Sequence, residues 1–221
     1  SKNPDYKLNE STSWENDWLI ENTLHYDNIF GDHSVSVLAG YSAQRNNSRG
    51  FGAGRSGLPE GLYVIGAGSV ANQTTSGDAW ANTMISMFGR AMYSYADRYM
   101  LSASIRRDGS SKFADGHRWG TFPSVSAGWN VMNEDFFEQA KEVMNELKVR
   151  ASYGVLGNLN GIGNYATQST VTSGLNNIQG SSLWEGAITG EKWTSLSTVT
   201  WEKTKTFNIG LDMALWNSKL T

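Results

Sequence analysis

Two glycine-rich runs carry the spacing G-x-G-x-x-A, which in dinucleotide-binding proteins wraps a pyrophosphate group. They are the runs Gly66–Ala71 and Gly161–Ala166. That chemistry needs a helix N-terminus directly after the glycines and an acidic residue about 20 positions further on. Residues Asn72–Gly77, which follow the first run, form a poor helix, and the second run fails the same test. We therefore interpret both runs as glycine-rich surface loops.

Catalytic and metal-binding motifs are missing from the sequence. It has no cysteine, which excludes a disulfide framework, a thiolate metal site and a cysteine nucleophile. His25 and His33 flank a short turn and His117 lies in a loop, so we expect surface histidines rather than metal ligands. There is no Walker loop, paired-histidine zinc motif or G-x-S-x-G nucleophile elbow. We predict a protein that is not an enzyme, with no catalytic residue, metal or cofactor.

Two charged runs have structural interpretations. The run Arg106–Gly109 could form an anion site, but it is better interpreted as a strand end with an inward-facing ion pair that leads into a turn. A short amphipathic helix is predicted over about 133–144, started by Asn133. Glu134, Asp135 and Glu138 would favour its first turn electrostatically, so no acid or base role is assigned to them.

Tryptophans in or beside the long connections are the candidate substrate-binding residues. Flat aromatic faces beside amide and hydroxyl groups suit sugars or peptides, and loops on a rigid scaffold commonly carry binding. The candidates are Trp80, Trp184 and Trp193, and Trp119 lies in a similar place. The alternative for each tryptophan is that it packs a loop or forms part of an aromatic rim.

Composition excludes several classes of protein. The 221 residues carry 18 Lys and Arg against 21 Asp and Glu, a formal net charge of -3. They contain neither a basic block that would indicate a nucleic-acid partner nor an acidic tail. No apolar run approaches the roughly 18 residues of a membrane-spanning helix. The 24 glycines, 9 tryptophans and only 3 prolines instead indicate many strands joined by turns.

Alternation of apolar and polar residues predicts an all-β chain of seven long antiparallel strands. In the fourth, Tyr99, Leu101, Ala103 and Ile105 share one face, because successive side chains point to opposite sides of a strand. We expect every charge in the strands to lie on the polar face. The predicted strands span about 13–27, 33–46, 82–95, 98–109, 119–131, 146–157 and 197–215, with an eighth beginning at 219–221.

The connections between these strands alternate between short and long. Short links near 27–32, 96–97 and 216–218, with the helix at 133–144, alternate with long links near 47–81, 110–118 and 158–196. Short periplasmic turns and long extracellular loops are typical of an up-and-down transmembrane β-barrel. A soluble antiparallel sheet with one buried face would also alternate. Strands of 12 or more residues and three long loops favour the barrel.

Four segments resemble the barrel of SusC/RagA-type TonB-dependent transporters. They occur in the same order as in that family and are Asp97–Phe113, Trp119–Trp129, Leu147–Asn158 and Trp201–Asp212. The resemblance implies an outer-membrane importer of glycans or peptides that works with a SusD-like surface lipoprotein and takes energy from TonB. Such a barrel has about 22 strands around a plug.

The resemblance also implies that residues 1–221 form part of one barrel domain. The plug, the TonB box and most of the barrel lie outside the sequence, and Ser1–Asp5 lead into no apolar core of a signal peptide. We therefore expect a fragment of a Gram-negative outer-membrane protein that contacts lipid. Two alternatives remain: a soluble β-rich carbohydrate-binding module, and a barrel enzyme or adhesin.

Overall fold

The chain is all-β with short 3₁₀ helices in the residues that the computed structural model describes, which are 6–142, 144–168, 170–179, 182–190 and 198–215. The strands and helices are β1 (Tyr6–Phe30), β2 (His33–Leu58), η1 (Ile65–Ala67), η2 (Val70–Asn72), β3 (Gln73–Tyr95), β4 (Tyr99–Ser110), β5 (Trp119–Asn130), η3 (Val131–Asn133), η4 (Asp135–Glu142), β6 (Met144–Asn158), β7 (Thr170–Gln179), β8 (Ser182–Gly190) and β9 (Glu202–Leu215).

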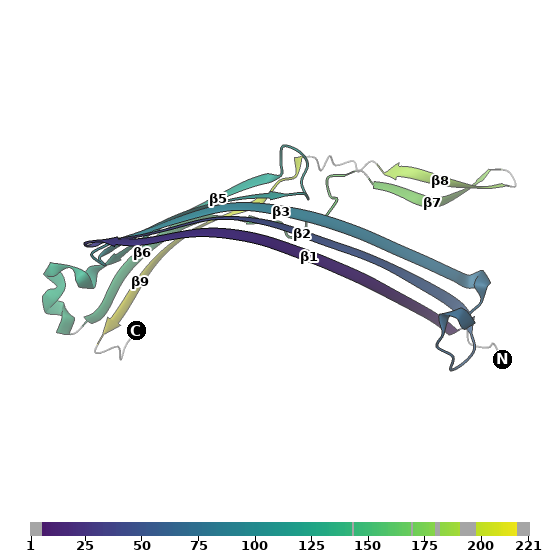
Figure 1. Cartoon of the computed structure of the whole chain (residues 1–221), viewed down its shortest axis with the longest axis horizontal. Helices are drawn as coiled ribbons and strands as arrows, with labels where there is room; N and C mark the ends of the chain where they lie inside the picture. The colour runs from purple at the N-terminus through teal and green to yellow at the C-terminus, as the bar shows by residue number, and fades with distance from the viewer. Residues whose placement is uncertain (1–5, 143, 169, 180–181, 191–197, 216–221) are drawn as a thin grey trace. The chain divides into compact units, whose positions relative to one another are not determined.

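Seven strands form one sheet in the order β1-β2-β3-β4-β5-β6-β9 (Figure 1). The pairs β3–β4, β4–β5, β5–β6 and β6–β9 are antiparallel. Strands β7 and β8 pair antiparallel in a separate two-stranded sheet. Because sheet neighbours follow one another along the chain, apart from this inserted hairpin, the topology is up-and-down, as the sequence predicts.

The turn between β3 and β4 has the tight geometry that an antiparallel hairpin needs. Ala96 and Asp97 both have positive φ, 50° and 52°, and the Arg98 amide donates to the Tyr95 carbonyl at 2.9 Å. Positive φ at both central residues matches the right-handed twist of the flanking strands. This turn fixes the register in which Tyr95 lies opposite Tyr99.

The first three strands are longer than the alternation predicts. Strands β1, β2 and β3 have 25, 26 and 23 residues, so most of the expected long link 47–81 is strand. Between β2 and β3 lie only a short connection and the helices η1 and η2. The expected link 158–196 likewise contains the β7–β8 hairpin. The possible strand at 219–221 lies outside the described residues.

The segment between β5 and β6 differs from the predicted helix. Instead of one helix started by Asn133, the structure has the 3₁₀ helix η3, which ends at Asn133, followed by η4. The Asn133 side chain does not cap a helix, because its Nδ2 atom donates to the Asp97 carbonyl at 3.0 Å. Asp135 lies in the first turn of η4, as expected, whereas Glu134 precedes that helix.

The chain divides into two compact units. One comprises Ser1–Leu19 and Gln44–Thr83, and the other comprises Ile20–Ala43 and Met84–Thr221. In the first unit Trp14 stacks on Phe51 with 6.0 Å between ring centroids. In the second unit an aromatic core of Phe113, Phe122 and Trp201 closes the loop between β4 and β5.

Candidate functional site

The sheet of the second unit has a polar face and an apolar face, which the register of the strands defines. On the polar face, Ser102, Ser126, Ser152 and Asn208 form a continuous row across β4, β5, β6 and β9. The adjacent row on the opposite face consists of Leu101, Ala127, Ala151 and Ile209. Each apolar residue therefore meets apolar neighbours, and each hydroxyl meets other polar groups.

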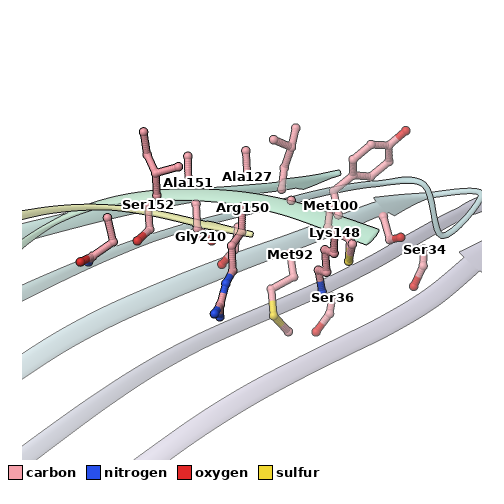
Figure 2. Close-up of a pocket in the computed structure, with 18 residues that line it drawn as sticks. Ser34, Ser36, Met92, Met100, Ala127, Lys148, Arg150, Ala151, Ser152 and Gly210 are labelled. Carbon is pink, nitrogen blue, oxygen red and sulfur yellow. The ribbon is translucent and has the colours of Figure 1, made fainter. Parts of the chain in front are cut away.

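A hollow of about 870 Å³ lies on the polar face. Figure 2 shows Lys148, Arg150, Met92 and Ser34 pointing to one side of the sheet, whereas Ala151 points to the other. Serines, an asparagine, two cations and the apolar residues Met92 and Met100 line the hollow. Such a lining can donate hydrogen bonds to hydroxyl, amide and carboxylate groups, and it contains no nucleophile–base pair.

The two cations of the hollow are only partly neutralised. Arg150 Nη2 lies 2.9 Å from Asp212 Oδ1, and Lys148 is the register partner of Asp212. A Cβ atom at Gly210 would lie 2.6 Å from Arg150 Nε, so the glycine gives the arginine room to cross β9. One carboxylate thus faces two cations in this part of the polar face.

An ion pair between Arg106 and Asp108 lies on the polar face nearer the long loops. Asp108 is 7% exposed and accepts from Arg106 Nε at 2.8 and 2.9 Å. Arg106 Nη2 donates to the Ser86 hydroxyl at 3.0 Å, and its Cζ atom lies 5.7 Å from the ring centroid of Phe88. This is the ion pair that the sequence predicts at the end of the fourth strand.

The loop ends above these strands are anchored by aromatic packing. The rings of Phe113 and Phe122 lie 5.4 and 5.2 Å from that of Trp201, centroid to centroid. Trp201 Nε1 donates to the Arg118 carbonyl at 2.9 Å, and Lys112 Nζ donates to the Ile162 carbonyl at 3.0 Å. The bases of two long loops are therefore fixed to the strands and to each other.

Glu134 organises the opposite end of the same strands. Its carboxylate accepts from the Tyr99 hydroxyl and, at 3.0 Å, from Trp129 Nε1, and Arg98 Nη1 lies 3.4 Å away. The hydrogen bond from Tyr99 is the largest cause that holds the pKa of Glu134 below its ordinary value; the bond from Trp129 and the Arg98 charge add to it, and partial burial opposes it. Sequence reasoning missed this role, because no local pattern brings Glu134 to Tyr99.

Where the structure describes them, the predicted tryptophans lie in different strands. Trp80 is half-buried in β3 and belongs to the first unit, whereas Trp184 lies in β8, opposite Asn177. Trp193 lies outside the described residues. Trp119 packs against the apolar face, where a Cβ atom at Gly109 would lie 2.9 Å from its ring. Substrate contact by Trp80, Trp184 and Trp193 stays a prediction.

The histidines and the two glycine-rich runs singled out in the sequence do not form a catalytic or metal site among the described residues. His33 Nδ1 lies 2.7 Å from the Tyr93 hydroxyl and His25 Nε2 lies 3.2 Å from the Ser36 hydroxyl. In the described part of the chain, no three His, Asp or Glu residues are grouped to hold a metal ion. The two G-x-G-x-x-A runs lie between strands, the first across the short helices η1 and η2, and in the part of the chain that the structure describes neither run is followed directly by a longer helix.

One expectation about charge is wrong. Lys205 lies opposite Val155 on the apolar face of β9. Arg107 lies opposite Met87 and Thr121 in register, on the apolar face with Ile105. Arg107 is tolerated there because it lies near the loop end of β4, with its guanidinium over the Trp119 ring at 5.2 Å from Cζ to the centroid.

Within the described ranges, no helix is long and apolar enough to cross a membrane.

Comparison with known proteins gives a consistent result. Residues 2–221 match the family described as "TonB dependent receptor-like, beta-barrel". TonB-dependent receptor P3 of Formosa agariphila is 33% identical over 212 residues, which cover 91% of this chain and 20% of that protein. TonB-dependent receptor SusC of Bacteroides thetaiotaomicron is 30% identical over 205 residues, covering 90% of this chain and 19% of that protein.

Solved structures agree with the sequence relatives. The RagAB peptide importer in its "closed-closed" state superposes with a TM-score of 0.85 at 25% identity, over 98% of this chain and 24% of that chain. The structure titled as the RagAB peptide transporter gives a TM-score of 0.81 at 25% identity, over 96% of this chain and 23% of that chain. The sheet is thus that of a receptor barrel.

The family match decides between the alternatives that the alternation leaves open. A receptor barrel presents its apolar face to lipid, so a soluble carbohydrate-binding module and a barrel enzyme are not supported. The chain spans about a fifth of the length of the curated relatives it matches. This chain therefore belongs to the β-barrel family of TonB-dependent receptors of the Gram-negative outer membrane, and it resembles SusC and RagA within that family.

Proposed function

We propose that this chain is part of the single barrel domain of an active importer that takes up glycans or peptides across the outer membrane. The observation that carries the proposal is the likeness to the RagAB peptide importer over 98% of the chain, with a TM-score of 0.85. The 30% identity to SusC supports the same assignment. A barrel of about 22 strands with a plugged lumen would place the polar face inside.

The polar face has the chemistry that such a route needs. The row Ser102, Ser126, Ser152 and Asn208 offers donors and acceptors that suit the hydroxyls of a glycan or the amides of a peptide. The cations in the hollow would favour the carboxylates of a peptide or of an acidic sugar. These groups belong to the interior of the barrel rather than to its lipid-facing surface.

The family membership of this chain is also the basis for proposing a plug, a TonB box and a surface lipoprotein. We propose that the plug and the TonB box lie in parts of the parent protein outside this sequence, and that TonB supplies energy through them. We also propose a SusD-like lipoprotein that covers the loop end of the barrel. The support is the likeness to structures titled as the RagAB peptide transporter and importer, a compound name that indicates two components.

The test is extraction of the parent protein from outer membranes in detergent, followed by peptide mapping beyond Ser1 and Thr221. We expect a polypeptide about five times as long as this chain, from its coverage of the relatives, with a co-purifying lipoprotein. Deletion of its gene should abolish uptake of one glycan or peptide from a labelled panel, and the intact gene should restore that uptake. A stable, detergent-free species of 24.3 kDa without flanking peptides would contradict the proposal.

A further inference from the structure

An unpaired cation lies at the edge of the lipid-facing surface. Arg107 shares the apolar face with Ile105 and Met87, which are 55% and 50% exposed. It is exposed, and no carboxylate of the described residues lies within salt-bridge distance of it. The neighbouring Arg106, on the polar face, is instead paired with Asp108. The two arginines therefore meet different environments although they are adjacent in sequence.

The position of Arg107 along β4 marks the level of lipid headgroups. From Tyr99 to Arg107 the outward-facing positions span about 26 Å at about 3.3 Å per residue, and about 20 Å after strand tilt. This is close to the height of the apolar band of an outer-membrane barrel, about 25 Å. With Tyr99 and Trp129 at the turn end, Arg107 and Trp119 lie at the loop end, the outer leaflet. An arginine is costly at the middle of the membrane and tolerated at this level.

The local geometry leaves the guanidinium available to an anion. The Trp119 ring folds across Gly109, where no side chain obstructs it, and the guanidinium of Arg107 lies over that ring. Stacking on an aromatic face holds an arginine in place while its N–H edges stay directed outward. Paired N–H groups match the oxygens of a phosphate in a bidentate arrangement.

We propose that Arg107 and Trp119 form a binding site for a phosphate group of an outer-leaflet glycolipid, such as the phosphates of lipid A. Arg107 binds the phosphate, and Trp119 contacts the sugar and the start of the acyl chains, which suits an aromatic side chain at a membrane interface. The site is continuous with the surface that faces the hydrocarbon, so a membrane lipid is its occupant. It is separate from the polar face that would carry substrate.

The test is native mass spectrometry of the parent receptor in detergent with purified lipid A. We expect Arg107→Ala to weaken lipid A binding about tenfold, the effect of losing a charge-assisted contact, and Arg107→Lys to retain part of the binding. Chemically dephosphorylated lipid A should bind the unaltered receptor about as weakly as lipid A binds the Arg107→Ala variant. The control is Arg90→Ala, which removes an exposed arginine from the polar face of the neighbouring strand β3.

Two results would overturn the site. Equal lipid A binding by the Arg107→Ala and Arg90→Ala variants would show that Arg107 does not contact the lipid. Equal binding of lipid A and its dephosphorylated form by the unaltered receptor would show that acyl chains alone are bound. Because Arg107→Lys keeps the charge and most of the side-chain volume, it separates loss of the site from a failure to fold.

Discussion

The two faces of strands β4, β5, β6 and β9 are made from alternate residues of the same segments, yet different interactions stabilise them. The apolar face carries Leu101, Ala127, Ala151 and Ile209, which are register partners across the four strands. The polar face carries paired charges such as Arg106 and Asp108. A face that meets lipid must exclude charges from its middle, whereas a face that lines a wet interior can carry charged and hydrogen-bonding groups. Apolar and polar residues therefore alternate along these strands because one face meets lipid and the other meets water.

The largest effect should come from reversing this rule at the middle of the apolar band. We expect Ala103→Arg, midway between Tyr99 and Arg107, to lower the free energy of unfolding of the parent receptor by about 2 to 4 kcal/mol, because the charge would lie in hydrocarbon. Unfolding by guanidinium chloride in lipid vesicles measures the change. The matched variant is Ser102→Arg on the polar face, for which we expect a loss below about 1 kcal/mol. Equal losses for both variants would mean that the two faces do not meet different solvents.

A smaller effect should follow from breaking the charge pairing of the polar face. We expect Asp108→Ala to cost about 1 to 2 kcal/mol, because it removes the bifurcated hydrogen bond from Arg106 Nε to both carboxylate oxygens, an amount reduced by the partial exposure of that arginine. Asp115 makes a 2.9 Å pair with Arg118 but is 91% exposed, so Asp115→Ala should cost no more than about 0.5 kcal/mol. The same unfolding assay compares them. A cost for Asp115→Ala that matched that for Asp108→Ala would show that burial does not matter at this pair.

The sequence predicts the strands best where one face meets lipid. The spans 98–109 and 119–131 agree with β4 and β5 to within one residue at each end. The strand β2 continues well past the predicted end at residue 46, through Asn46, Asn47 and Ser48. Polar residues fall on both faces there, so alternation disappears and only pairing with neighbouring strands reveals the extended backbone. The alternation of apolar and polar residues identifies a strand only where its two faces meet different environments. Where both faces are polar, the alternation disappears.

The candidate site is less predictable than the strands. The ion pair of Arg106 and Asp108 follows from spacing, because residues two apart on a strand share a face. The contact between Glu134 and Tyr99 joins residues 35 positions apart, and it depends on the register of β4 with β5 and on the 3₁₀ helix η3. The placement of Arg107 over Trp119 likewise needs the register, which lays the ring across Gly109. Contacts of this kind cannot be predicted from the sequence alone, because they depend on which strands pair and in which register.

The smallest effect concerns the rim at the turn end, where Glu134 is bound to aromatic residues of the apolar face. Because the pKa of Glu134 is lowered in the folded protein, ionised Glu134 stabilises the fold fully above the ordinary glutamate pKa of 4.5. This contribution is lost as pH falls through the lowered folded pKa. We expect Glu134→Gln to be less stable than the unaltered receptor at pH 7, with a difference that shrinks as pH falls below 4.5.

Unfolding midpoints measured from neutral to acidic pH test this prediction. Asp135→Asn is the control, because Asp135 is the other acid paired with Arg98 but lacks the hydrogen bonds from Tyr99 and Trp129 that Glu134 accepts. A difference between Glu134→Gln and the unaltered receptor that stayed constant with pH would show that the ionised carboxylate is not what holds the rim. A difference that closes on acidification would show that this rim depends on the charge of Glu134.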